Sequence, residues 1–143
     1  KGFQLISVKS PAGKEFFIIN THLDAGRDNS DRKARESQLN QILTKVKQEL
    51  SGEALILAGD LNLNWNDDQD RLLLENFKSN LGLLDPINGV QVESGWSIID
   101  YILYRNSEKT SFDVIKKGQD IKFLTEKGPL SDHPALYLKL KIN

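Results

Sequence analysis

An uninterrupted run of apolar residues at positions 54–58 constrains the fold of this chain more than any other feature. The run reads Ala-Leu-Ile-Leu-Ala, ends at Gly59 and contains no polar position. A short continuous apolar run between turn signals is typical of a strand that is buried on both faces. The sequence therefore predicts a layered fold in which this strand lies inside a sheet that is covered on each side.

Further strand-like segments surround this run. Residues 3–8 and 15–22 flank a Pro-Ala-Gly-Lys turn at 11–14, so they are expected to form a hairpin. Later strands are expected at residues 98–104, 111–116 and 136–142. In the last of these segments, leucine or isoleucine alternates with tyrosine or lysine, which is the period of a strand with one buried and one solvated face.

Two segments have the three- and four-residue period of amphipathic helices. Residues 30–50 place apolar side chains at this spacing, with Ser30 as the expected N-cap and Gly52 as the expected stop. Residues 68–81 repeat the pattern and are closed by Gly82. Strands separated by two helices, without an internal repeat or a Pro/Gly-rich linker, indicate one unit of the α/β class.

Composition and charge exclude several classes of protein. The 143 residues, 38% hydrophobic and 27% charged, have the profile of one globular domain. The net charge of -1 gives bulk electrostatics little to contribute to nucleic-acid binding, although a local basic groove is compatible with it. The absence of cysteine excludes disulfides, thiolate catalysis and zinc–thiolate sites. No run approaches the roughly 20 apolar residues of a membrane span, and no signal identifies a compartment.

Four polar motifs lie at the ends of the expected strands or inside one. They are Asn-Thr-His-Leu at residues 20–23, Gly-Asp-Leu-Asn at 59–62, Ile-Asp-Tyr at 99–101 and Ser-Asp-His-Pro at 131–134. Taken singly, a histidine after a strand is usually structural, and a Gly-Asp-x-Asn segment is usually a turn. The chain has only 2 histidines, however, and both lie at strand ends near carboxylates. An unpaired Asp100 inside an apolar strand would also be costly to bury, so the motifs are expected to form one site.

The residue types in these motifs fit the hydrolysis of a phosphate ester. Carboxylate and amide oxygens from Asp and Asn are ligands of the kind that Mg²⁺ or Mn²⁺ prefers. Histidine gives or takes a proton near neutral pH, and a neighbouring carboxylate fixes its tautomer. The reaction needs a metal ion that neutralises phosphate, a base for water and groups that stabilise the charge of the transition state.

In this order and at these spacings, the motifs resemble the last four signature motifs of the endonuclease/exonuclease/phosphatase superfamily, over about residues 16–138. The resemblance implies a four-layer α/β sandwich, of which residues 1–143 would form the C-terminal half. This half would be a mixed or mainly antiparallel sheet with helices on its outer face, and its inner face would pack against a second sheet that is absent or supplied elsewhere. The superfamily also takes an Asn and a Glu metal ligand from its N-terminal half, which is expected to be missing from this chain.

The resemblance also implies a role for each motif. The implied site residues are His22, Asp60, Asn62, Asp100, Asp132 and His133. Asp60, Asn62 and Asp132 would hold Mg²⁺ or Mn²⁺, and Asn62 would also bind a phosphate oxygen. His22 would contact the scissile phosphate and serve as acid for the leaving group. Asp100 would support a catalytic histidine, and His133 would be the general base or a phosphate-stabilising partner.

Further details resemble the sphingomyelinase-like branch of the superfamily. Residues 35–39 read Arg-Glu-Ser-Gln-Leu, the Gly-Asp motif continues as Asn-Leu-Asn at 62–64, and the loop at 106–108 reads Asn-Ser-Glu. The 35–39 segment has a second interpretation, as a solvated helix face beside one core leucine. Secreted sphingomyelinases can carry an apolar aromatic hairpin for membrane docking, whereas residues 105–130 are mostly polar and charged.

The expected function is divalent-metal-dependent hydrolysis of a phosphodiester by in-line attack of water, on a sphingomyelinase-like substrate. Asp24, Trp65, Asp67 and Trp96 lie in loops next to the motifs. Acidic and aromatic side chains of this kind can receive a quaternary cation, which favours a small head group such as phosphocholine over a polynucleotide. Two alternatives stay open: a deoxyribonuclease-like endonuclease or exonuclease that acts on nucleic acid, and a catalytically silent fragment or binding module.

Overall fold

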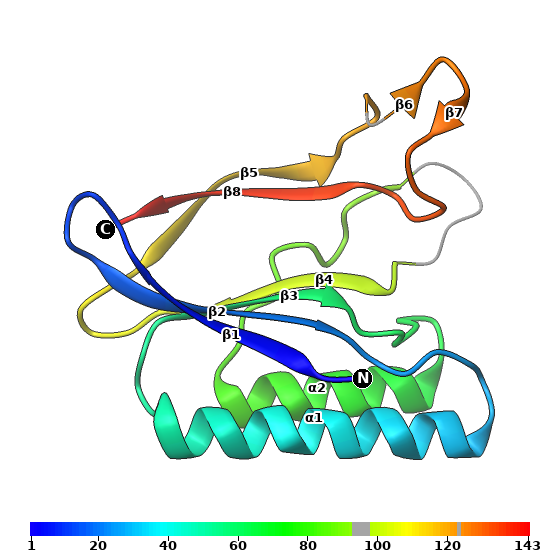
Figure 1. Ribbon diagram of the computed structural model, residues 1–143, viewed down its shortest axis with the longest axis horizontal. Coiled ribbons are helices and arrows are strands. Elements are labelled where there is room, and N and C mark those ends of the chain that lie inside the picture. Colours follow the sequence, from blue (N-terminus) through cyan, green and yellow to red (C-terminus); the bar gives the residue numbers. More distant parts are fainter. Residues whose placement is uncertain (93–97, 123) are drawn as a thin grey trace.

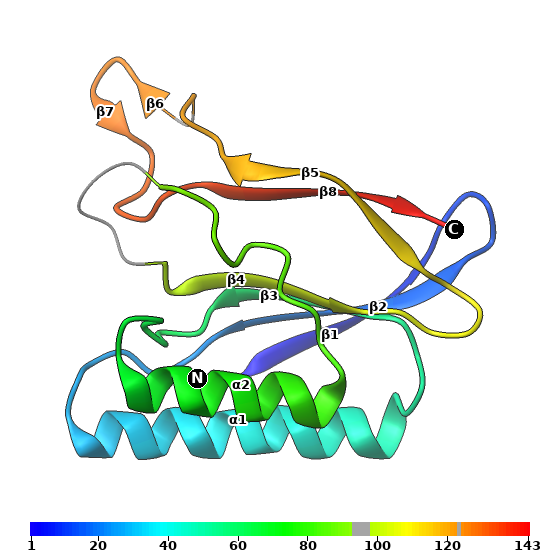
Figure 2. The same ribbon diagram turned by 180° about the vertical axis from the view of Figure 1, so that it is seen from behind.

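The computed structural model describes residues 1–92, 98–122 and 124–143. Its elements are β1 (Phe3–Lys9), β2 (Glu15–His22), α1 (Asn29–Glu49), β3 (Leu55–Asp60), α2 (Asp68–Leu81), β4 (Asp100–Arg105), β5 (Phe112–Gln119), β6 (Leu124–Thr125), β7 (Gly128–Pro129) and β8 (Leu136–Ile142). Both helices lie on one side of the β1 to β4 sheet, and the β5–β8 pair lies on the other side (Figures 1 and 2). The predicted α/β class is confirmed.

The larger sheet is mixed and has the strand order β1-β2-β3-β4. β1 and β2 form the expected antiparallel hairpin, β2 and β3 are parallel, and β3 and β4 are antiparallel. The register places His22 beside Asp60, and Asp60 beside Asp100. The ends of β2 and β3 therefore meet the beginning of β4 at one edge of the sheet.

The main core lies between this sheet and the two helices. Leu55 and Leu57 of β3 are fully buried there, together with α1 residues such as Ile42 and Val46. The intervening Ile56 packs on the opposite side, against the β5–β8 layer. The strand predicted from the run at 54–58 is thus covered on both faces, as its uninterrupted apolar pattern requires.

A second, smaller core joins the larger sheet to the β5–β8 pair. The ring of Phe112 packs edge-on against Phe16 and Tyr104, with centroid separations of 5.4 and 5.9 Å. The apolar face of β8 packs against this cluster through Leu138, Leu140 and Ile142. The expectation that the second layer is absent or supplied elsewhere therefore needs correction. Two strands of that layer, β5 and β8, come from the chain itself. After β4 the chain turns back and continues as β5 over the other face of the larger sheet.

The helix ends differ from the sequence-based expectation at one point. α1 is capped by Asp28, whose side chain accepts hydrogen bonds from the backbone N–H groups of Ser30 and Asp31. The Ser30 hydroxyl also donates to Asp28, and this bond together with the backbone bonds favours the ionised form and lowers the pKa of Asp28. The Asp31 side chain accepts in return from the Asp28 N–H, which completes a capping box. The prediction of Ser30 as N-cap was wrong, because the helix begins one residue earlier, at Asn29, and Asp28 takes the capping position.

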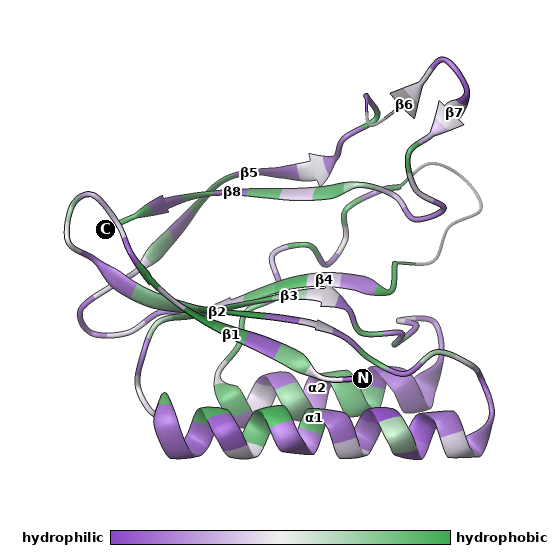
Figure 3. Ribbon diagram, in the orientation of Figure 1, coloured by the Kyte–Doolittle hydropathy of each residue, from purple (hydrophilic) through white to green (hydrophobic). Residues whose placement is uncertain are grey.

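The second helix begins and ends as predicted, with Asp67 as its N-cap and Gly82 in the left-handed conformation at φ 63°. Both helices carry hydrophilic residues along much of their length (Figure 3). Within the ranges that the structure describes, neither helix has the length and apolarity needed to cross a membrane. The short β6–β7 hairpin was not expected from the sequence.

Candidate metal and catalytic site

The candidate site lies where β2, β3 and β4 meet at one edge of the larger sheet. Asp60 is the last residue of β3 and Asp100 is the first residue of β4, and the two are directly paired in the antiparallel register. His22 ends β2 and is paired with Asp60 on its other side. Strand pairing alone therefore places three of the predicted site residues in a row.

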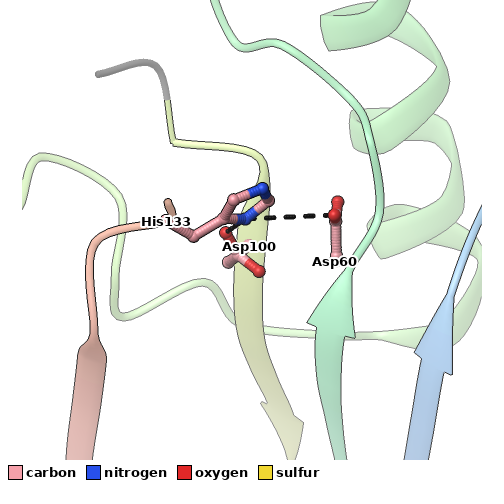
Figure 4. Close-up of side chains that lie close together, drawn as sticks. All are labelled: Asp60, Asp100 and His133. Carbon is pink, nitrogen blue, oxygen red and sulfur yellow. Dashed lines mark hydrogen bonds and ion pairs between the residues drawn. The ribbon is translucent and has the colours of Figure 1, made fainter. Parts of the chain in front are cut away.

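His133 reaches this row from the opposite layer. It belongs to the segment that precedes β8, where its backbone N–H donates to the Ser131 hydroxyl at 3.1 Å. Its Nδ1 atom lies 2.7 Å from Asp100 Oδ2 and 3.9 Å from Asp60 Oδ2. Figure 4 shows the imidazole turned toward both carboxylates. The site is thus built from both layers of the fold.

The protonation of this pair is set by burial and by the nearby carboxylates. The hydrogen bond to Asp100 raises the pKa of His133, and the charges of Asp100, Asp60 and Asp132 add to this effect. Burial raises the pKa of Asp100, and the neighbouring Asp60 charge acts in the same direction. A cationic partner alone would lower the pKa of a carboxyl, so desolvation outweighs the His133 contact at Asp100.

The end of β3 and the loop after it have a backbone that only certain residues allow. Gly59 has φ 145°, and a Cβ atom there would lie 1.9 Å from the carbonyl oxygen of Thr21, so a larger residue cannot be accommodated. Asn62 has φ 51°, a left-handed conformation that Asn tolerates. Asp60 Oδ1 accepts from the Asn62 N–H at 2.8 Å, and Asn62 Nδ2 donates to Leu23 O at 3.1 Å. These bonds tie the loop after β3 to the loop after β2.

The remaining predicted residues occupy different positions at this edge. His22 is open to solvent, with 60% of its side chain exposed, and its Nε2 atom lies 3.4 Å from Asp60 Oδ2. Asp132 is exposed and acts on His133 through its charge. The structure thus brings His22, Asp60 and Asp100 together with His133, whereas Asp132 stays at the periphery.

A cation would fit the donor set at the centre of the site. Asp60, Asp100 and His133 each offer one ligand atom, and these atoms lie within 4.8 Å of one another. Two carboxylates and an imidazole suit Mn²⁺ and, through the oxygens, Mg²⁺. The sequence had assigned Asp100 only a supporting role. Its place beside Asp60 follows from the β3–β4 register, a non-local feature that no local sequence signal reveals.

Of the two loop tryptophans that were expected to receive a quaternary cation, only Trp65 lies within the described residues. Trp65 lines a pocket of about 420 Å³ together with Ile87 and Tyr101, and none of the site residues lines it. The ammonium group of Lys78 lies 5.5 Å from the centroid of the Trp65 ring, so this ring already has a cation over it. Trp96 lies outside the described residues.

The sequence of this chain matches a known family of proteins. Residues 4–133 match the sequence profile of the Endonuclease/Exonuclease/phosphatase family. A sphingomyelinase of Mycobacterium tuberculosis is 30% identical over 95% of this chain, and the match covers 30% of that protein. The chain therefore spans less than a third of the length of this relative.

Solved structures show the same fold. An endonuclease/exonuclease/phosphatase from Beutenbergia cavernae superposes with a TM-score of 0.77 at 20% identity, over 99% of this chain and 39% of that one. A variant of beta toxin from Staphylococcus aureus with bound magnesium ions superposes with a TM-score of 0.57 at 18% identity, over 100% of this chain and 54% of that one.

Proposed function

We propose, from the premise that the chain belongs to the Endonuclease/Exonuclease/phosphatase family, that it carries the catalytic residues of a divalent-metal-dependent phosphodiesterase. The reaction would be in-line attack of water on a phosphodiester. The observation that supports this most directly is the cluster of Asp60, Asp100 and His133, with His22 beside it at the same edge. A pair of carboxylates next to two imidazoles offers both a cation site and groups for proton transfer.

The metal would be held by Asp60 and by Asp100 beside it. Asn62 and Asp132 are the further ligands that the sequence predicts, and Asp132 would contribute from the periphery of the site. A bound divalent cation neutralises phosphate charge and lowers the pKa of a coordinated water molecule. The chain would form the C-terminal portion of the family's domain, with further ligands from an N-terminal portion. A match that covers only 30% of the sphingomyelinase supports a longer domain, and the C-terminal place rests on the order of the motifs.

The proton chemistry falls to the two histidines. Because Nδ1 of His133 is hydrogen-bonded to Asp100, the Nε2 atom of His133 would take part in the reaction. In the neutral form this atom takes a proton from water, and in the cationic form it donates a hydrogen bond to a phosphate oxygen. His22 is open to solvent and can reach a leaving group as its acid.

Charge at the site favours a small head group over a polynucleotide. Arg32, which follows the His22 motif, contacts the carboxylates of Asp67 and Asp70 at 3.4 Å, so it is already engaged by acidic groups. A nuclease needs several cations free for phosphates along a strand. The relative named sphingomyelinase supports the same choice. Trp65 does not, because Lys78 lies over its ring.

The test supplies the whole protein, produced from its complete reading frame, with Mg²⁺ or Mn²⁺ and with sphingomyelin vesicles or plasmid DNA. We expect release of phosphocholine that stops when EDTA is added. Metal-dependent DNA nicking without phosphocholine release would favour the deoxyribonuclease-like alternative. Absence of both activities, with either metal, would favour the catalytically silent module.

A further inference from the structure

A charged residue of α1 is buried against the loop that follows His22. The Arg35 side chain is only 1% exposed, although arginine is rarely found inside a protein without partners. Its Nη1 atom donates to the carbonyl oxygens of Asp24 at 3.2 Å and Gly26 at 2.9 Å. Three residues further along α1, Gln38 Oε1 accepts from the Asp24 N–H at 2.9 Å. The 35–39 segment is therefore no solvated helix face, since it holds the loop that follows His22.

A carboxylate of α2 plays the same part for the other loop. The Asp70 side chain is 4% exposed, and its Oδ2 atom accepts from the Asn64 N–H at 3.1 Å. Its Oδ1 atom lies 3.6 Å from Arg35 Nη2 and 3.4 Å from Arg32 Nε. Asp70 therefore joins the loop that follows Asp60 and carries Asn62 to the guanidinium group that holds the loop after His22.

Stability alone does not account for this pair. A buried ion pair loses so much hydration that well-packed apolar residues in its place are often as stable or more stable. The pair also leaves Arg35 Nε without a hydrogen-bond partner among the described residues. Its contacts on both sides are to backbone atoms of loops that begin at His22 and Asp60, so the atoms it fixes belong to the site's framework.

We propose that Arg35 and Asp70 form a positioning pair that sets the separation of His22 from Asp60 and Asn62. The two residues touch neither substrate nor metal, and they act through the loops at 23–26 and 61–64. This inference rests on the proposed function for its effect on turnover. Its structural part, the coupling of the two loops, is measured independently of any activity.

The activity test compares Arg35→Lys and Asp70→Asn in the whole protein. We expect kcat to fall by about 10- to 100-fold with KM nearly unchanged, because a misplacement of about 1 Å at a catalytic group can cost a hundredfold in rate. A double variant, Arg35→Met with Asp70→Leu, should recover thermal stability relative to the single variants but not turnover. Recovery of both would show that the pair only stabilises the fold.

Arg105→Lys is the matched control. Arg105 also clamps loops through the carbonyl oxygens of Leu50, Glu53 and Leu81, at 2.8 to 3.0 Å. It ends β4 whereas Asp100 begins it, which places it roughly 17 Å from the site at about 3.4 Å per residue. This variant should lose stability and keep its kcat. An equal loss of kcat in Arg105→Lys and Arg35→Lys, at matched loss of stability, would overturn the inference.

Hydrogen–deuterium exchange tests the coupling without an assay. Among the described residues, the Asp70 side chain bonds to loop backbone at Asn64 alone, yet Asp70→Asn should speed exchange in residues 23–26 as well as in 61–64. Faster exchange confined to 61–64 would refute the pair as a link between the loops. If wild-type protein hydrolyses no phosphodiester but exchange is coupled, the proposed function fails while the positioning role stands.

Discussion

His133 and Asp100 lie 33 positions apart in the sequence, and a 2.7 Å contact joins Nδ1 of the first to Oδ2 of the second. Asp100 starts a strand of the larger sheet, and His133 precedes a strand of the β5–β8 layer. One contact between the two layers therefore fixes the ring of the histidine against the carboxylate row. The geometry of the site therefore depends on the relative position of the two layers.

The first prediction concerns the two histidines. His133→Ala and His22→Ala, each made in the whole protein, should lower kcat by about 10²- to 10⁴-fold, which is the usual contribution of a positioned acid or base. Thermal melting at pH 8.5 should change little, because His22 is open to solvent and the stabilisation from protonated His133 is lost as pH rises. A variant that keeps wild-type turnover but melts earlier would identify that histidine as structural.

The second prediction is a pH dependence of stability in metal-free protein. Both His133 and Asp100 have raised pKa values in the folded state. A raised pKa means that the folded state binds the proton more tightly, so the stabilisation is present at low pH and is lost as pH rises. For His133 the loss begins near its ordinary value of 6.5 and is complete above its folded pKa.

Urea unfolding in EDTA, from pH 5.5 to 8.5, measures this slope. His133→Gln removes the titrating group and should flatten the curve over that range, with Asp100 contributing its own loss above its ordinary value of 3.8. An unchanged slope in His133→Gln would contradict the assignment of the pH dependence to this residue.

The sequence predicted the elements whose signals are local. The run at 54–58 was recognised as a strand without its partners, although only the face of Leu55 and Leu57 is fully buried and the face of Ile56 is half-buried. Gly82 marked the end of α2. The N-cap of α1 was misplaced because Asp28 and Ser30 are both good caps, and the choice between them depends on the approach of the preceding loop. Local chemistry identified candidate residues more reliably than their exact partners.

What the sequence could not supply is non-local. The pairing of Asp60 with Asp100 depends on strand register, and the separation of β5 and β8 into their own layer depends on where the chain crosses the core. The burial of Arg35 was also open, since a charged residue on a helix is usually solvated. The role of Arg35 becomes visible only in the folded chain, where it contacts the loop after His22 and Asp70 of α2.

The third prediction concerns metal binding by residues 1–143. We expect weak binding of Mg²⁺ in calorimetric titration, because Mg²⁺ demands near-ideal octahedral geometry and the family's N-terminal carboxylate ligand is expected to be missing. Asp60→Asn should abolish what binding remains, while Asp132→Asn, at the exposed periphery, should weaken it less. Tight stoichiometric binding by this chain alone would contradict the prediction, and equal effects of the two variants would make Asp132 a full ligand.

The fourth prediction concerns the smaller core. Phe112→Ala should lower the free energy of unfolding by about 3 to 5 kcal/mol, because it removes both aromatic contacts between the layers. Val114→Ala, on the same strand but 38% exposed, is the control and should cost much less.

Loss of the β5–β8 layer would also carry His133 away from Asp100, so Phe112→Ala should reduce turnover more than its effect on melting suggests. Denaturant unfolding and kinetics of the same preparations check both parts.

The last prediction separates the two substrate classes by salt. If a polynucleotide were the substrate, each phosphate contact would release counterions, and log affinity would fall with log salt by about 0.9 for every contact. The net charge of the chain is -1, and Arg32, a cation near the His22 motif, is already engaged by Asp67 and Asp70. We therefore expect kcat/KM for a choline phosphodiester to vary little between low and moderate salt. We also expect any DNA nicking to be slow. Arg32→Ala should change the salt dependence of neither activity, because the carboxylates of Asp67 and Asp70 already neutralise the charge of Arg32. Efficient nicking with a steep salt dependence would instead establish the nuclease alternative.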